Sequence, residues 1–220
     1  MNVLVIAAHP DDEILGIGGT VRRHVLAGDR VVSFIACEGI SMRYDEEHRR
    51  RLDDHIRRAA EVLGVDDIRQ GDLPDQKLDT VPLVTIVAKI EELVREVKPA
   101  VVYTHFGGDV NHDHRVLFQA VQVAVRPYAA PFVREVLAYE TPSSTEWGTP
   151  DVHGAFVPDV YVDISETLEA KVRAFACYER EVREAPHPRS SASLRARAAT
   201  WGSVIGVAAA EPLHVVRIVR

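Results

Sequence analysis

The chain has 220 residues, of which 46% are hydrophobic and 27% are charged, and a formal net charge of -7. This length suits a single domain over residues 1–220, which can bury roughly 70% of the surface that its unfolded form exposes. The acidic balance gives no bulk attraction to a polyanion, so we expect no nucleic-acid partner. Cys37 and Cys177 lie far apart without CxxC spacing, which excludes a dithiol metal site and indicates reduced thiols.

The apolar run at residues 1–8, MNVLVIAA, has no basic residue before it and is followed directly by an acidic cluster. It therefore predicts a first strand, and neither a signal peptide nor a membrane span. Because no segment directs the chain elsewhere, we expect a cytoplasmic protein.

Short runs rich in valine and isoleucine alternate along the chain with stretches in which apolar residues recur at helical spacing. This alternation predicts an α/β fold in which helices flank a Rossmann-like, mostly parallel sheet. In such sheets, ligands bind beyond the carboxyl ends of the strands, near the point where the strand order reverses. We expect strands at residues 2–8, 30–36, 65–70, 100–105, 133–140 and 213–219, and helices at residues 13–28, 45–63, 81–97 and 113–126.

The first strand ends in AHPDDE, at residues 8–13. Pro10 is typical of a first helical turn, which places His9 near the N-cap and the three carboxylates within that turn. The helix dipole favours anions there, and for Glu13 a well-charged helix start is an adequate explanation. Capping needs only one acceptor, however, and explains neither His9 nor the consecutive Asp11 and Asp12 at a site that is partly closed over.

The fourth strand is followed by NHDH, at residues 111–114. His9 and Asp12 are three residues apart on one helical turn, so they can converge on one point, and a third ligand from this second cluster would complete a facial set. A divalent cation would offset the repulsion between the carboxylates. Two histidines and one carboxylate with an open position are a catalytic zinc arrangement.

AHPDDE and the following GIGGT, with DVNHDHR about 100 residues later, resemble the LmbE-like or PIG-L family of zinc-dependent de-N-acetylases. The resemblance covers most of the chain and implies that acetyl is removed from an N-acetylated amino sugar of the N-acetylglucosamine type, or from its conjugate. It also implies that Zn²⁺, or another divalent metal, is held by His9, Asp12 and His114. Asp11 is then the general base that takes a proton from the attacking water.

One position departs from the family pattern. The second motif often reads HxDH, and Asn111 stands where its first histidine assists the tetrahedral intermediate. We expect His187 to replace that histidine, because a loop stiffened by proline on both sides suits a group placed for a purpose. A solvated histidine in a surface loop is the alternative. His105, which ends the fourth strand, is the second candidate.

The expected substrate contacts are Arg43, Asp75, Asn111 and Trp147. Arg43 and Asp75 resemble family positions that bind sugar hydroxyls, although each could form only a surface salt bridge. Trp147 could stack on a sugar face or simply pack. The amide of Asn111 can donate a hydrogen bond to an oxyanion.

Three alternatives stay open at this point. The first is an amidase of thiol-sugar conjugates, and the second is a non-catalytic metal-binding domain, against which an unliganded Asp11 argues. The third is a nucleotide-binding Rossmann module, which is disfavoured because GIGG follows three carboxylates that would repel a pyrophosphate. We expect a small-molecule sugar partner and a homo-oligomer.

Overall fold

The computed structural model describes residues 1–39 and 46–220. Within these ranges the strands are β1 (Asn2–Ala7), β2 (Arg30–Cys37), β3 (Asp67–Leu73), β4 (Val101–His105), β5 (Glu135–Tyr139), β6 (Val160–Asp163) and β7 (Ala210–Ile218). The α-helices are α1 (Asp12–Leu26), α2 (Glu46–Leu63), α3 (Leu83–Val97), α4 (His112–Ala124), α5 (Pro150–His153), α6 (Leu168–Ala176) and α7 (Ser191–Ile205).

The strands form one sheet in the order β3-β2-β1-β4-β5-β7-β6. β1 pairs in parallel with both β2 and β4, and the outer pairs β2–β3 and β4–β5 are also parallel. Only β7 runs antiparallel to its described neighbours, β5 and β6. The predicted α/β fold with a mostly parallel sheet is therefore confirmed. The strand order reverses between β1 and β4, so a ligand is expected beyond their carboxyl ends.

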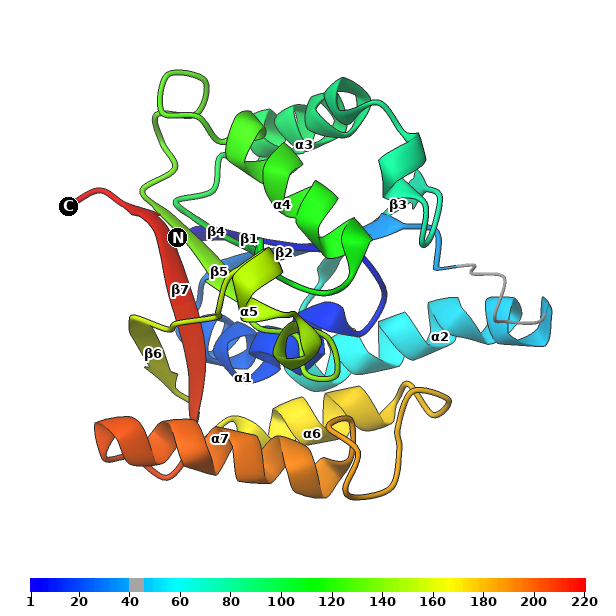
Figure 1. Ribbon diagram of the computed structural model, residues 1–220, viewed down its shortest axis with the longest axis vertical. Coiled ribbons are helices and arrows are strands. Elements are labelled where there is room, and N and C mark those ends of the chain that lie inside the picture. The colour runs from blue at the N-terminus through cyan, green and yellow to red at the C-terminus, as the bar shows by residue number, and fades with distance from the viewer. Residues whose placement is uncertain (40–45) are drawn as a thin grey trace.

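Helices cover both faces of this sheet (Figure 1). α3 and α4 lie on one face, where Ile90 belongs to the same buried cluster as Leu4 of β1. α1, α2 and α6 lie on the other face, where Ile14 and Phe175 share a second cluster with Val3. Successive β1 residues thus serve opposite cores, because side chains alternate across a strand.

Helix α1 bends at Ile17, where φ is −133° and ψ is 25°. Just beyond the bend, the backbone N–H groups of Gly19 and Thr20 donate to the carboxylate of Glu211 on β7, at 2.9 and 2.7 Å. Lys171 of α6 donates to the same carboxylate at 2.6 Å. This buried carboxylate therefore joins α1, α6 and β7 and satisfies amides that the bend would leave without partners.

Glu211→Ala should lower the free energy of unfolding by about 3–5 kcal/mol, the usual cost of breaking a buried ion pair. The reason is that Lys171, whose side chain is 7% exposed, would lose its carboxylate partner while staying buried. Glu169→Ala is the control, because it removes an ion pair with Arg195 in which the side chains are 56% and 44% exposed, and should cost at most about 1 kcal/mol. Urea unfolding measures both losses, and equal losses would contradict this account.

The glycines of GIGGT permit close packing of α1. A Cβ atom at Gly16 would lie 2.3 Å from Cδ2 of Tyr139, and one at Gly19 would lie 2.8 Å from Cγ2 of Ile164. Because only glycine lets the helix approach these side chains so closely, the motif is explained without a bound pyrophosphate.

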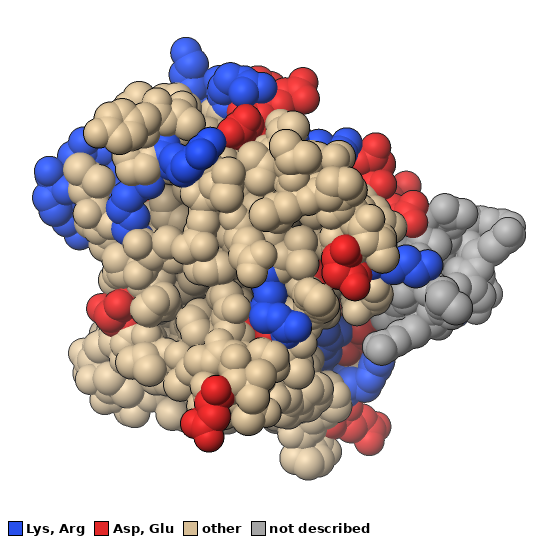
Figure 2. All heavy atoms as spheres, turned by 45° about the horizontal axis from the view of Figure 1, so that its top comes forward, with Lys and Arg blue, Asp and Glu red and all other residues tan. Residues whose placement is uncertain are grey.

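Charged side chains on the face drawn in Figure 2 lie mostly toward its edges, and other residues form most of its centre. Lys and Arg groups and Asp and Glu groups both occur there, so this face is not a field of a single charge. Over residues 1–39 and 46–220, no helix has both the length and the apolar character that a membrane crossing requires.

Candidate active site

A cavity of about 740 Å³ lies beyond the carboxyl ends of β1 and β4 and is called the active-site cavity below. Its lining includes His9 and Asp11 from the turn after β1, His114 from α4, and His187 and Arg189 from the segment before α7. This volume is typical of small-molecule sites, which occupy about 300–1,000 Å³. The cavity therefore lies where the sheet topology predicts a ligand.

Helix α1 begins at Asp12 with Asp11 at its N-cap, two residues later than the position of Pro10 suggests. The difference arises because Asp11 has φ 102°, in the left-handed region, and cannot continue a right-handed helix toward Pro10. Its carbonyl oxygen still accepts from the backbone N–H groups of Ile14 and Leu15. The turn points Asp11 and Asp12 in different directions, so consecutive carboxylates acquire different neighbours.

The predicted metal ligands converge. Asp12 Oδ2 lies 3.2 Å from His9 Nδ1 and 3.2 Å from His114 Nε2, and these two ring nitrogens are 3.3 Å apart. One atom from each side chain falls within 4.8 Å of the others, so the group can hold a metal ion. Two imidazole nitrogens and a carboxylate oxygen are a donor set that zinc accepts.

Each ligand histidine has a carboxylate at its second ring nitrogen. His9 Nε2 lies 3.0 Å from Asp113 Oδ2 and 3.1 Å from Asp75 Oδ1, and His114 Nδ1 lies 3.3 Å from Asp109 Oδ1. Metal-ligating histidines usually have such partners, which fix the ring orientation and the tautomer. The residues present therefore fit a divalent ion.

The sequence analysis predicted only some of the carboxylates that contact the ligand histidines. Asp113 lies in the NHDH motif and contacts His9. Asp75 was expected to bind sugar hydroxyls, yet it also contacts His9. Asp109 was missed, although an aspartate in the loop between β4 and α4 was a usable signal; it is buried and accepts hydrogen bonds from Ser144 and Thr145.

The electrostatics of the ligand group favour its charged forms. Burial acts against every charge here, but the hydrogen bonds of His9 with Asp113, Asp12 and Asp75 outweigh it and raise the pKa of His9 well above its usual value. Likewise, Asp12 and Asp109 raise the pKa of His114 to about 9 in spite of burial. The nearby His114 also holds the pKa of Asp12 well below its usual range. Without metal, both imidazoles therefore carry an extra proton at pH 7.

Asp11 lies apart from the ligand group and contacts Arg189 instead. Arg189 NH1 donates to Asp11 Oδ2 at 3.0 Å, while its Nε donates to Ser143 Oγ at 2.7 Å. Burial raises the pKa of Asp11 to about 8, with Arg189 opposing that rise and Asp12 and Glu181 adding to it. Arg189 was not predicted as a site residue, although it lies two residues after His187 in the same proline-containing loop.

His105 is enclosed by protein. Its side chain is fully buried, its ring stacks on that of His114 with centroids 3.8 Å apart, and its Nε2 accepts from the backbone N–H of Ala8 at 2.9 Å. Burial, with the charge of His114 added, lowers the pKa of His105 to about 3. These contacts keep His105 neutral and place its remaining N–H near Thr141, and His105 is not among the residues that line the active-site cavity.

His187 and Trp147 both line the active-site cavity. Their rings meet edge to face with centroids 6.3 Å apart, and the Trp147 residue is 55% exposed. His187 Nδ1 accepts from the backbone N–H of Arg189 at 3.1 Å, so the neutral ring carries its proton on Nε2. The loop thus presents a histidine with a proton available for donation.

Asn111 also lines the cavity and is the N-cap of α4, because its Oδ1 accepts from the backbone N–H of Asp113 at 2.9 Å. Only its amide N–H₂ group is then left to donate to a ligand. Arg43, the remaining predicted substrate contact, lies outside the described residues.

A family model described as GlcNAc-PI de-N-acetylase, PIG-L, matches residues 4–125, which contain the whole proposed ligand group. The chain belongs to the PIG-L family. The LmbE-like resemblance found in the sequence is thereby confirmed.

Relatives of this PIG-L family member cover nearly its whole length. The diacetylchitobiose deacetylase of Thermococcus kodakarensis is 30% identical, over 97% of this chain and 82% of the relative. A probable N-acetyl-alpha-D-glucosaminyl L-malate deacetylase of Bacillus cereus is 29% identical, over 80% of this chain and 82% of the relative. Among solved structures, the conserved protein TT1542 of Thermus thermophilus superposes with a TM-score of 0.80 at 25% identity, over 99% of this chain and 96% of that one.

Proposed function

We propose that this protein is a metal-dependent N-deacetylase that hydrolyses the acetamido group of an N-acetylglucosamine-type sugar or its conjugate, with zinc as the preferred metal. The observation that carries the proposal is the pairing of a His-Asp-His group with a separate carboxylate, Asp11, on one cavity wall. The deacetylase relatives support the acetamido sugar as substrate. A purely structural metal site would need no such extra carboxylate.

The metal ion would be held by His9, Asp12 and His114. When bound, it supplies a Lewis acid for the amide carbonyl and lowers the pKa of a water. Asp113 keeps the His9 ring oriented by accepting a hydrogen bond from its Nε2, and Asp109 Oδ1 lies 3.3 Å from His114 Nδ1, the ring nitrogen that faces away from the metal.

Asp11 then acts as the general base. Its carboxylate takes the proton of the attacking water, and Arg189 holds the side chain in place through Oδ2 at 3.0 Å. The other carboxylate oxygen is left for the water. Because a cation nearby lowers the pKa of a carboxyl group, a filled metal site keeps Asp11 ionised at neutral pH in spite of its burial.

His187 donates the proton that the departing amine requires. Its Nε2–H is the free end of a ring whose Nδ1 is already held by the backbone N–H of Arg189. Asn111 cannot supply a proton at neutral pH, but its amide can donate a hydrogen bond to the oxyanion. We assign the acid role to His187 and not to His105, because both ring nitrogens of His105 are engaged inside the protein.

His187→Gln should lower kcat by about 10²-fold or more, as loss of a general acid does. His112→Gln is the matched control, because His112 is an exposed histidine that also lines the cavity; it should change kcat little. Metal content should be unaffected in both variants. A His187→Gln enzyme with an unchanged kcat would remove His187 from the mechanism.

The decisive test of function is an acetate-release assay with zinc-loaded protein. The substrates are N-acetylglucosamine, diacetylchitobiose, an N-acetylglucosaminyl malate and an N-acetylated thiol glycoside, and metal-free protein is the blank. We expect release from at least one of the acetamido sugars. Release from the thiol glycoside alone would favour the amidase alternative, and no release from any substrate would contradict the proposal.

The cytoplasmic location, the homo-oligomeric state and the sugar contact of Arg43 stay predictions. Trp147 is placed to stack on a sugar ring, since its exposed side chain lies at the cavity. Asp75 can reach a hydroxyl only with the part of its carboxylate that His9 leaves free.

A further inference from the structure

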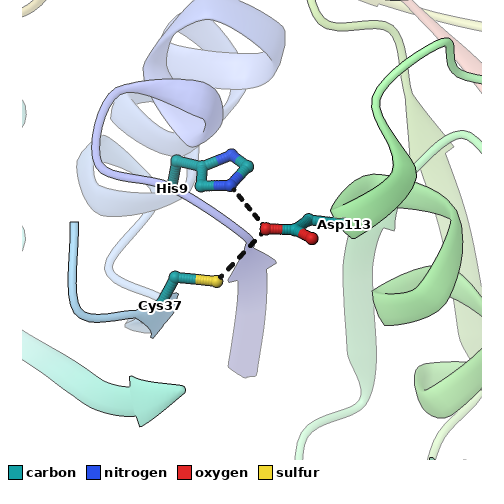
Figure 3. Close-up of side chains that lie close together, drawn as sticks. All are labelled: His9, Cys37 and Asp113. Atoms are coloured by element: carbon teal, nitrogen blue, oxygen red, sulfur yellow. Dashed lines mark hydrogen bonds and ion pairs between the residues drawn. The ribbon is translucent and has the colours of Figure 1, made fainter. Parts of the chain in front are cut away.

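Cys37 ends β2 beside the proposed ligand group but has no part in the proposed reaction. Its Sγ lies 3.9 Å from Asp113 Oδ2, and His9 Nε2 lies 3.0 Å from the same oxygen (Figure 3). The three side chains come from β2, α4 and the turn after β1, and one ligand atom from each falls within 4.8 Å of the others. Two hydrogen-bond donors thus point at one carboxylate oxygen.

We propose that His9, Cys37 and Asp113 form a second metal site, called the thiol site below, which takes a thiophilic divalent ion such as Cd²⁺ or excess Zn²⁺. The ion replaces two protons, one from Cys37 Sγ and one from His9 Nε2. The net charge of the site is therefore unchanged when the ion binds. Thiolate and imidazole ligands together select soft and borderline ions. Asp75 Oδ1 lies 3.1 Å from His9 Nε2, so a further carboxylate neighbours the site.

His9 cannot serve both sites at once as a neutral ring. A neutral imidazole binds a metal through one nitrogen and carries its proton on the other. Its Nδ1 faces Asp12 and its Nε2 faces the thiol site. Filling the thiol site of the metal-free protein therefore leaves the remaining ring proton on Nδ1, where it faces Asp12 and blocks the nitrogen that the proposed catalytic metal requires.

An ion can approach the thiol site from the active-site cavity. Cys37 itself is 2% exposed, but His9, Asp75 and Gln76 all line that cavity. The backbone N–H groups of Gln76 and Leu78 hold the Asp113 carboxylate at 2.7 and 3.0 Å, so this ligand is oriented before an ion arrives. Orientation of that kind lowers the ordering cost of binding.

A cadmium titration of the metal-free protein tests the thiol site directly. Sulfur-to-cadmium charge-transfer absorption should rise to a plateau in the wild type and in Cys177→Ser, and should be absent in Cys37→Ser and Cys37→Ala. Cys177 is the matched control, since it is the chain's other cysteine and is also buried. Full absorption in both Cys37 variants, or none in the wild type at saturating Cd²⁺, would overturn the proposal.

The inhibitory consequence rests on the proposed function and has a separate test. Excess Cd²⁺ added to the zinc-loaded enzyme should lower activity about tenfold or more in the wild type, as disturbing a ligand's support does, but much less in Cys37→Ser. Equal inhibition of the two would show that cadmium does not act through Cys37. An enzyme without deacetylase activity would fail this second test and leave the absorption result to decide whether the thiol site exists.

Discussion

Asp11→Asn should lower kcat by about 10²- to 10⁴-fold, the range typical of a lost general base, while the bound metal stays in place. An asparagine side chain has nearly the same shape as aspartate but cannot take a proton from water. It also tolerates the left-handed backbone at this position, where φ is 102°. The substitution therefore removes the chemistry with little strain, which alanine would not do.

Asp11 is expected to be dispensable for metal binding because its neighbours differ from those of Asp12. Asp11 Oδ2 contacts Arg189 at 3.0 Å. Asp12 Oδ2, in contrast, lies 3.2 Å from a nitrogen of each ligand histidine. Asp12→Asn should accordingly lose metal and activity together.

Glu13→Gln is the control for this experiment. Glu13 is the next carboxylate along the chain and is also buried, and burial raises its pKa to about 8. It lines a separate small cavity under α1 and not the active-site cavity. Elemental analysis and steady-state kinetics on the three variants distinguish the general base from the metal ligand. Loss of metal in Asp11→Asn would reverse the roles assigned to Asp11 and Asp12.

Zinc affinity should fall about 100- to 1,000-fold for each unit that pH drops below neutrality, because binding must displace protons from two imidazoles and also ionise Asp11. In the metal-free protein the pKa of His9 is raised well above its usual value and that of His114 is raised to about 9. Because these pKa values are raised, both imidazoles stay protonated throughout this pH range, and zinc must displace a proton from each. Asp12, with its lowered pKa, adds no proton to this competition.

Calorimetric zinc titrations in buffers of different ionisation enthalpy measure the number of protons released. We expect between two and three at pH 7: two from the imidazoles and up to one from Asp11, whose pKa of about 8 falls when the metal binds. The number should be one lower for His114→Gln if that variant still binds metal weakly. The exposed Glu169→Gln variant should match the wild type. Release of no protons would mean that His9 and His114 are already neutral without metal, against the electrostatics described above.

Short sequence motifs predicted most of the chemical groups of the site. AHPDDE and NHDH contain the His-Asp-His group that the structure brings together, and the alternation of strands and helices placed both motifs at the carboxyl edge of one sheet. This prediction was correct because the loops that follow parallel strands lie at the same edge of the sheet, whatever their distance in sequence. The position of Pro10 predicted the N-cap of α1 at His9, two residues before Asp11, because the left-handed backbone of Asp11 cannot be inferred from Pro10.

The helices and strands of the C-terminal third were harder to predict from the sequence. Helix α7 has few buried residues, Leu194, Ala198 and Gly202, so its sequence has little apolar periodicity even though Ser190 caps it and accepts from the Ser193 N–H. Strand β6 is only Val160–Asp163, and each of its residues is half-buried. Short or weakly buried elements depend on the sheet and helices they meet, and periodicity alone does not detect them.

The sequence by itself thus determined the fold class, the place of the site and the residues able to hold a metal. Only the tertiary structure decided which carboxylate supports which histidine, that Arg189 holds Asp11, and that Cys37 lies beside His9. These pairings join segments up to 178 residues apart. Periodicity in the sequence does not predict these contacts, because they depend on how the loops pack at the edge of the sheet. A buried charged group there is stable only when it is paired.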